Sequence, residues 1–156
     1  MAVTIRRAHT GDEGSIARFV VKLVEQHVEY DPKRFSKFVT PDGAAAFYAS
    51  RFEVADARVL VAESSGRVIG FAYVEFEARN YAQLAEDVGW LHDVFVEAEF
   101  RSEGAGKALI EAAGSAAREM GANKLVLATA ARNLKAQDFF ASVGFYPTMI
   151  EMTLNL

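Results

Sequence analysis

The most informative stretch of the sequence is Arg101-Ser102-Glu103-Gly104-Ala105-Gly106-Lys107. It follows residues 90–96, whose apolar character predicts a strand, and leads into residues 104–120, whose apolar periodicity predicts a long helix. Glycines at 104 and 106 let the backbone curl where the helix begins, so that successive N–H groups can point into one concavity at the positive helix end. The stretch predicts a pyrophosphate site; the plainer alternative is a glycine-eased turn between strand and helix.

This turn differs from two common nucleotide-binding motifs. No Gly-Lys-Ser or Gly-Lys-Thr follows it, and Leu109 stands where a dinucleotide fingerprint has its third glycine. The pattern is Arg-x-x-Gly-x-Gly after an apolar strand. In this it resembles the central motif of the GNAT superfamily of N-acetyltransferases, Arg/Gln-x-x-Gly-x-Gly/Ala.

A second segment carries the same resemblance. Residues 133–145 are similar to the family's downstream pattern Asn-x-x-Ala-x-x-Phe-Tyr-x-x-x-Gly-Phe, and they depart from it only at Phe140. Together with the strand before the turn, the similarity covers Gly89 to Phe145. Upstream of Gly89 only the expected order of strands and helices follows the family.

The rest of the chain predicts an α/β protein. We expect a strand at Val3–Arg7, a helix begun by a capping box at Thr10 and Glu13, and a helix with Thr40 as its N-cap. A hairpin over 59–77, an irregular stretch over 78–88, a strand at 125–128, a helix at 134–143 and an extended segment over 145–156 follow. The resemblance implies a GNAT-type fold, with a mixed central sheet of about six to seven strands and about four helices, and we expect one N-acetyltransferase domain over residues 1–156.

The composition limits the kinds of partner and cofactor that we expect for this protein. With 17 Lys and Arg against 21 Asp and Glu, the net charge is −4, which argues against a nucleic-acid partner. The absence of cysteine excludes a thiol nucleophile, a disulfide framework and a thiolate metal site, and we expect no metal. No apolar run is long enough to span a bilayer and the first residues lack a secretory signal, so we expect no membrane association and a cytoplasmic location.

The resemblance implies acetyl-CoA as the acetyl-donor cosubstrate. Backbone groups of Val94, Phe95 and Val96 would bind the pantetheine arm and polarise the thioester carbonyl. The turn at 101–107 would bind the pyrophosphate, and Asn133, Ala136 and Phe140 would line the arm. From its position alone, Asn133 is equally well explained as the N-cap of the helix at 134–143.

Transfer to an amine needs a proton acceptor, because an alkylamine is protonated roughly a thousand to one at neutral pH. His92 and Asp93 are the candidates in the strand before the turn, and strict alternation would place them on opposite faces of the sheet. Imidazole suits a base or a water-mediated relay, and Asp93 could instead bind a substrate ammonium. A structural histidine is the alternative for His92. Glu75 and Glu77 are further candidates, although surface carboxylates are the plainer interpretation.

Phe140 departs from the family pattern, which usually has a tyrosine placed to protonate the leaving thiolate. Tyr146, or else Tyr73, is a candidate replacement acid. We expect direct acetyl transfer to a primary amine of a small, cationic molecule. Alternatives are an acyl-CoA sensor without turnover, an enzyme acting on protein amino groups and, with least support, a nucleotide-binding domain. The alternating C-terminal segment could also pair across a two-fold axis in a homodimer.

Overall fold

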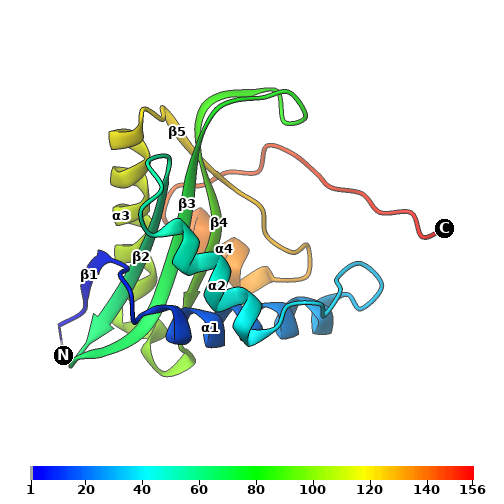
Figure 1. Ribbon diagram of the computed structural model, residues 1–156. Helices are drawn as coiled ribbons and strands as arrows, with labels where there is room; N and C mark the ends of the chain where they lie inside the picture. Colours follow the sequence, from blue (N-terminus) through cyan, green and yellow to red (C-terminus); the bar gives the residue numbers. More distant parts are fainter. Residues whose placement is uncertain (1) are drawn as a thin grey trace.

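A twisted five-stranded sheet organises the protein, with its strands in the order β1-β2-β3-β4-β5 (Figure 1). The computed structural model describes residues 2–156. Neighbouring strands from β1 to β4 are antiparallel and β5 runs parallel to β4. The strands are β1 Thr4–Arg7, β2 Ala57–Ser64, β3 Arg67–Asn80, β4 Ala85–Val96 and β5 Lys124–Leu127. This mixed sheet confirms the α/β class, but the expected six to seven strands are five, because residues 145–156 are extended without joining the sheet.

Helices cover both faces of the sheet. They are α1 Glu13–Tyr30, α2 Pro41–Arg51, α3 Ala105–Met120 and α4 Leu134–Ser142, with a 3₁₀ segment η1 at Ala98–Glu103 between β4 and α3. One apolar core lies between the sheet and α3 with α4, and includes Val74, Leu91 and Leu109. A second lies between the sheet and α1 with α2, and includes Phe19 and Phe71. The two cores separate the sheet into an α3 face and an α1/α2 face.

The side chains of nearby residues fix the N-termini of α1 and α2. The Thr40 side chain accepts a hydrogen bond from the Gly43 N–H at 3.1 Å, which confirms it as the N-cap of α2. The capping box expected at Thr10 was wrong, because the N-cap of α1 is Asp12. The Asp12 carboxylate is instead held by the Arg6 guanidinium at 2.8 Å, which ties the start of α1 to β1.

Strands β3 and β4 are both longer than expected and form a second hairpin. The stretch over 78–88 was expected to be irregular, yet β3 runs on to Asn80 and β4 begins at Ala85, with Arg79 and Glu86 paired across the strands at 2.8 Å. The hairpin extends beyond the helices as an arm (Figure 1). No helix within residues 2–156 is both long enough and apolar enough to cross a membrane.

Candidate active site

The candidate site begins at the point in β4 where β5 stops pairing with it. β5 pairs with β4 only from Val88 to Leu91, whereas β3 stays paired with β4 as far as Val96. Beyond Leu91, no strand in the described part of the chain pairs with the β5 side of β4. The backbone of residues 92–96 is therefore open along one edge, which is where the family resemblance implies an extended ligand.

The turn after β4 leads through a left-handed glycine into the N-terminus of α3. Gly104 is the residue before α3 and has φ 82°, in the left-handed region that favours glycine. The first-turn N–H groups of α3, on Ala105 to Lys107, have no carbonyl acceptor within their own helix and lie at its positive end. Arg101 donates from Nε to the Val96 carbonyl at 2.9 Å, which fastens the turn to the end of β4.

Gly106 has a different role from the one expected. It lies inside the first turn of α3, and a Cβ built on it would come within 3.1 Å of the Phe139 ring in α4. Its missing side chain therefore allows α4 to pack closely against the start of α3. The tight curl itself depends on Gly104.

The register of β4 against β3 slips by one residue at the candidate base. Asp93 lies opposite Tyr73 and Leu91 lies opposite the very next residue of β3, so His92 has no partner of its own. Such a β-bulge disturbs strict alternation. The His92 ring stacks on the Tyr73 ring at 5.3 Å between centroids, and Asp93 bonds to Tyr48 of α2, so both side chains lie on the α1/α2 face. The expectation of opposite faces was therefore wrong.

Glu75 connects His92 to helix α2. Its Oε1 accepts a hydrogen bond from Arg51 Nη2 at 2.7 Å and another from the Tyr73 hydroxyl, and its Oε2 lies 3.4 Å from His92 Nε2. Burial acts to raise the pKa of Glu75, but the hydrogen bond from Tyr73 and the neighbouring His92 and Arg51 side chains hold that pKa below its ordinary value. Glu75 is thus an ionised, oriented carboxylate and not a loose surface charge.

Asp93 occupies a more apolar position. Its Oδ2 accepts a hydrogen bond from the Tyr48 hydroxyl at 2.5 Å. Burial raises the pKa of the Asp93 carboxyl, although Tyr48 and the nearby His92 and His27 act in the opposite direction. Asp93 therefore connects β4 to α2 and is poorly suited to hold an ammonium by charge.

An apolar cavity of about 330 Å³ opens beside Tyr48, between α1, the following connection and α2. Its lining residues are Val20, Phe38, Val39, Thr40, Gly43, Ala44, Phe47 and Tyr48. Phe47 also packs edge-on against Tyr73, with ring centroids 5.9 Å apart. The cavity is thereby connected by aromatic contacts to the residues around His92.

Glu77 completes an acidic cluster around the histidine. One ligand atom each from Glu75, Glu77 and His92 lies within 4.8 Å of the others, a spacing that could hold a metal ion or a bound ammonium. Trp90 lies opposite Glu75 on β4, with its ring centroid 6.1 Å from that of His92. Acidic and aromatic side chains therefore meet on one patch of the α1/α2 face.

The remaining expected site residues lie in or beyond α4. The Asn133 side chain accepts a hydrogen bond from the Ala136 N–H at 3.2 Å, so it is the N-cap of α4. Phe140 is buried between Phe139 and Phe145, with centroids 5.5 and 5.7 Å away. Tyr146 is exposed, and none of the contacts found within residues 2–156 joins it to His92.

Sequence reasoning missed two residues of this site. Arg51 and Tyr48 come from α2, which carries no family signature, and they contact β3 and β4 only after the chain has folded. An inward-facing glutamate on β3 was the one available signal, because a half-buried carboxylate requires a cationic partner.

The family model described as the acetyltransferase (GNAT) family matches residues 20–145. The chain belongs to the GNAT family of acetyltransferases. It is therefore an acyltransferase, and the matched region contains the site from α2 to α4.

Two relatives match over most of their length. The chain is 32% identical over 145 residues to the uncharacterized N-acetyltransferase YhfO of Bacillus subtilis (strain 168), covering 92% of this chain and 89% of that protein. It is 28% identical over 149 residues to thialysine N-epsilon-acetyltransferase of Bos taurus, covering 91% and 83%.

Solved structures show the same fold. Aminoglycoside N-acetyltransferase AAC(6')-Iy in complex with CoA matches with a TM-score of 0.81 at 19% identity, covering 99% of this chain and 95% of that one. A variant of the BH1408 protein from Bacillus halodurans matches with a TM-score of 0.84 at 19% identity, covering 98% and 99%. At these identities the likeness concerns the fold alone, and it confirms the GNAT-type architecture.

Proposed function

We propose that this GNAT enzyme transfers the acetyl group of acetyl-CoA directly to a primary amine of a small cationic molecule. The observation that carries the proposal is the position of the His92 and Glu75 pair. His92 lies on β4, whose open edge leads into the Gly104 turn, and Glu75 faces it from the neighbouring strand β3. A base and an anion site thus lie along one continuous piece of chain.

The donor fits the residues present. The helix N-terminus at Ala105 to Lys107 would hold the pyrophosphate, and the open backbone of Val94 to Val96 would hold the pantetheine arm. Bound acetyl-CoA supplies a thioester whose acetyl carbon is attacked by an amine. Backbone N–H groups beside it would stabilise the negative charge that develops on the carbonyl oxygen. A solved relative of the fold is a complex with CoA, which supports this donor.

His92 is the proposed proton acceptor. Glu75 faces Nε2 of its ring, and Arg51 and Tyr73 hold that carboxylate in place. A carboxylate in this position orients the imidazole and stabilises its protonated form after the imidazole has taken a proton from the substrate ammonium, which leaves a free amine to attack the thioester. Asp93 would then act through Tyr48 to position β4.

Glu77 and Trp90 are the proposed contacts for a positive charge on the acceptor. The carboxylate attracts a cation electrostatically, and the face of an indole ring attracts it through the ring quadrupole. A relative of similar length is a thialysine N-epsilon-acetyltransferase, and a solved relative acts on aminoglycosides; both names describe cationic amines. These names support the class of acceptor and do not choose a compound.

Phe140 cannot protonate the departing thiolate of CoA. Tyr146 was the expected replacement and stays a prediction; its exposed position beyond α4 gives it no contact with His92 in the described chain. We propose that the thiolate takes its proton from water. General acid help contributes a factor of about 10² to 10⁴, so transfer proceeds without it at a reduced rate.

Matched amines test the acceptor class. The rates for 1,4-diaminobutane and n-butylamine compare the same reacting amine with and without a second ammonium. We expect kcat/KM to be about tenfold or more higher for the diamine, and Glu77→Gln to remove most of that difference while leaving butylamine unchanged. A lysine-containing peptide in the same assay tests transfer to protein amino groups. Equal rates for the two amines would contradict the cationic acceptor.

A further inference from the structure

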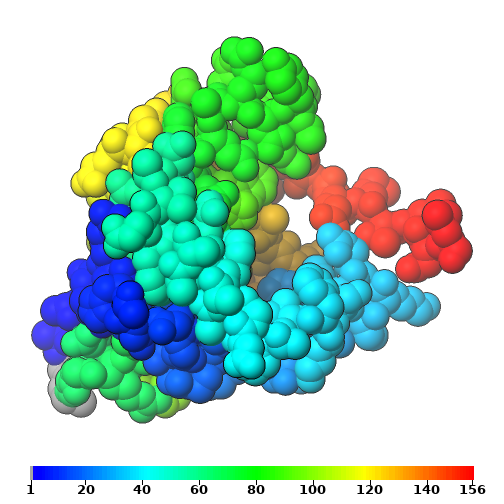
Figure 2. Space-filling view, viewed as in Figure 1, coloured from blue at the N-terminus to red at the C-terminus, as the bar shows by residue number. Residues whose placement is uncertain are grey.

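A polar cavity of about 360 Å³ lies between the connection that follows α1, the segment that precedes α4 and the extended residues 145–156. Its lining residues are Asp31, Pro32, Lys33, Arg34, Arg132, Thr153 and Asn155. Figure 2 shows a hollow on this face, between the connection in light blue and the C-terminal segment in red. The lining includes none of the residues proposed above for catalysis or donor binding. Its volume lies within the range of about 300 to 1,000 Å³ that is typical of small-molecule sites.

Positive charge predominates among the lining residues. Lys33, Arg34 and Arg132 are cationic, whereas Asp31 is the one carboxylate of the lining. The whole chain has a net charge of −4, so the charge of the cavity is opposite in sign to that of the protein. Clustered charges of one sign raise the local concentration of ions of the other sign. The cavity therefore favours an anionic ligand.

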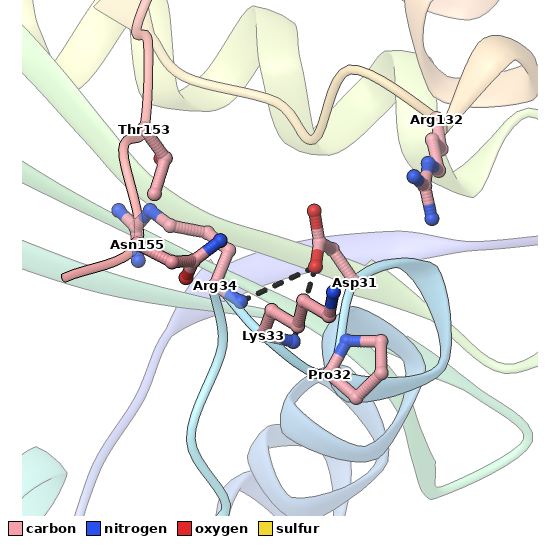
Figure 3. A pocket seen from close by; sticks show the side chains of 7 residues that line it. All are labelled: Asp31, Pro32, Lys33, Arg34, Arg132, Thr153 and Asn155. Carbon is pink, nitrogen blue, oxygen red and sulfur yellow. Dashed lines mark hydrogen bonds between the residues drawn. The ribbon is translucent and has the colours of Figure 1, made fainter.

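The Asp31 carboxylate does not neutralise these cations by direct pairing. Its Oδ1 accepts hydrogen bonds from the backbone N–H groups of Lys33 at 3.1 Å and Arg34 at 3.2 Å, which are the dashed lines in Figure 3. Within residues 2–156, no carboxylate lies at ion-pair distance from the side chain of Lys33 or of Arg132. Both cations are therefore available to an anion from outside the chain.

Arg132 is held in place by the end of helix α1. Its Nη1 donates to the Tyr30 carbonyl at 2.6 Å, and Tyr30 is the last residue of α1, at the negative end of the helix dipole. Figure 3 shows the Arg132 side chain pointing into the cavity from one side, with Arg34, Thr153 and Asn155 on the other. A guanidinium has five N–H donors, so most of those of Arg132 remain available to a ligand.

A carboxylate of the chain itself already binds beside the cavity. Arg34 donates from Nε to Glu151 Oε1 at 2.6 Å. Guanidinium and carboxylate groups match in shape and form paired, charge-assisted hydrogen bonds. The Glu151 side chain is 67% exposed, so nothing but this contact holds it against a competing anion. The contact indicates that the chemical group suited to Arg34 is a carboxylate.

We propose that this cavity binds a small organic anion with two or three carboxylate groups. One carboxylate takes the place of Glu151 at Arg34, and another pairs with Lys33 and Arg132. Because Arg34 and Arg132 lie on opposite sides of the cavity, an anion with a single charged group engages only one of them at a time. The site is separate from the Gly104 turn, and the proposal does not depend on the proposed acetyl transfer.

Titration calorimetry with citrate at low ionic strength tests the site. We expect the natural chain to bind citrate at least about tenfold more tightly than acetate or inorganic phosphate. Lys33→Gln combined with Arg132→Gln should weaken citrate binding at least about tenfold, with unchanged circular dichroism because both side chains are exposed. The control, Arg118→Gln with Lys124→Gln, removes the same two charges in the last turn of α3 and at the start of β5 and should leave the Kd within about twofold. A natural chain that does not bind citrate, or equal losses in the two double variants, would overturn the proposal.

Two single variants distinguish this cavity from the proposed donor site. Gly104→Asp should leave citrate binding unchanged. Glu151→Gln removes the competing carboxylate and should tighten citrate binding severalfold, whereas Glu119→Gln, which removes an exposed charge of α3, should have little effect. Citrate binding that Gly104→Asp weakens as much as the cavity pair does would belong to the turn before α3 and would contradict the proposal. So would equal Kd values for Glu151→Gln and Glu119→Gln.

Discussion

Replacing Gly104 with aspartate should have a small effect on the unfolding free energy and a separate, measurable effect on the affinity for the acetyl donor. The φ of 82° at Gly104 costs an L-residue about 1 to 2 kcal/mol, and asparagine and aspartate tolerate this region best. A Cβ at this position meets no atom within 4 Å, so no clash is added. A carboxylate at the start of a helix contributes about 0.3 to 1 kcal/mol in the stabilising direction. Gly104→Asp should therefore lose less than about 2 kcal/mol of unfolding free energy.

The same carboxylate would repel the proposed pyrophosphate. At about 6 Å from each of two phosphates, with full screening by water, the repulsion is about 0.7 kcal/mol per phosphate charge and about 1.4 kcal/mol in all. That is about a tenfold increase in Kd. A lower local dielectric constant would enlarge the effect, so tenfold is the smallest change expected.

Titration calorimetry with CoA measures this change. Gly104→Asn is the matched control, because it has the same shape and the same demand on φ without the charge. We expect the aspartate variant to bind CoA at least about tenfold more weakly than the asparagine variant, with the ratio falling as salt is added. Equal Kd values for the two variants would refute the phosphate site at Gly104.

Three further substitutions test the site around β4. His92→Ala should lower kcat/KM by about 10² to 10⁴ in steady-state kinetics, and a loss of less than threefold would contradict its role as base. Arg51→Ala should lower the unfolding free energy by about 1 to 3 kcal/mol in urea titrations, because Glu75 loses a charged hydrogen bond; Arg51→Lys should recover part of it. Asp93→Asn should leave stability unchanged at a pH below the ordinary carboxyl pKa. As the pH rises toward the raised pKa of Asp93, the substitution should become stabilising. Over that range the Asp93 carboxyl of the unsubstituted chain ionises freely in the unfolded state but not in the folded state, which lowers the unfolding free energy of that chain and not of the Asp93→Asn variant. A stabilisation independent of pH would contradict the burial of that carboxyl.

The helices of the second half of the chain were predictable because the residues that begin and end them are neighbours in the sequence. Gly121 and Gly144 have φ of 110° and 104° at the ends of α3 and α4, as their positions in the sequence predicted. The Gly104 turn was likewise predicted from the residues around it. These features depend on a few neighbouring residues, so one sequence contains the necessary information.

The failures depend on contacts between distant segments. The bulge at His92 results from the register of β4 against β3, which alternation within β4 cannot show. The lowered pKa of Glu75 depends on Tyr73, on His92 of the next strand and on Arg51, which is more than twenty residues earlier in another element. Residues 145–156 have the pattern of a strand and were counted toward the sheet. The pattern does not identify the strand with which these residues pair.

The most direct measurement is stoichiometric acetyl transfer. Acetyl-CoA carrying a ¹³C-labelled acetyl group is incubated with the chain and 1,4-diaminobutane, while free CoA thiol and acetylated amine are quantified by colour reaction and mass spectrometry. The chain contributes no thiol of its own, because it has no cysteine. We predict one labelled acetylamine for each CoA released, at a rate that falls with His92→Ala. Tight binding of CoA without any labelled amine, across cationic amines of every size, would contradict the account.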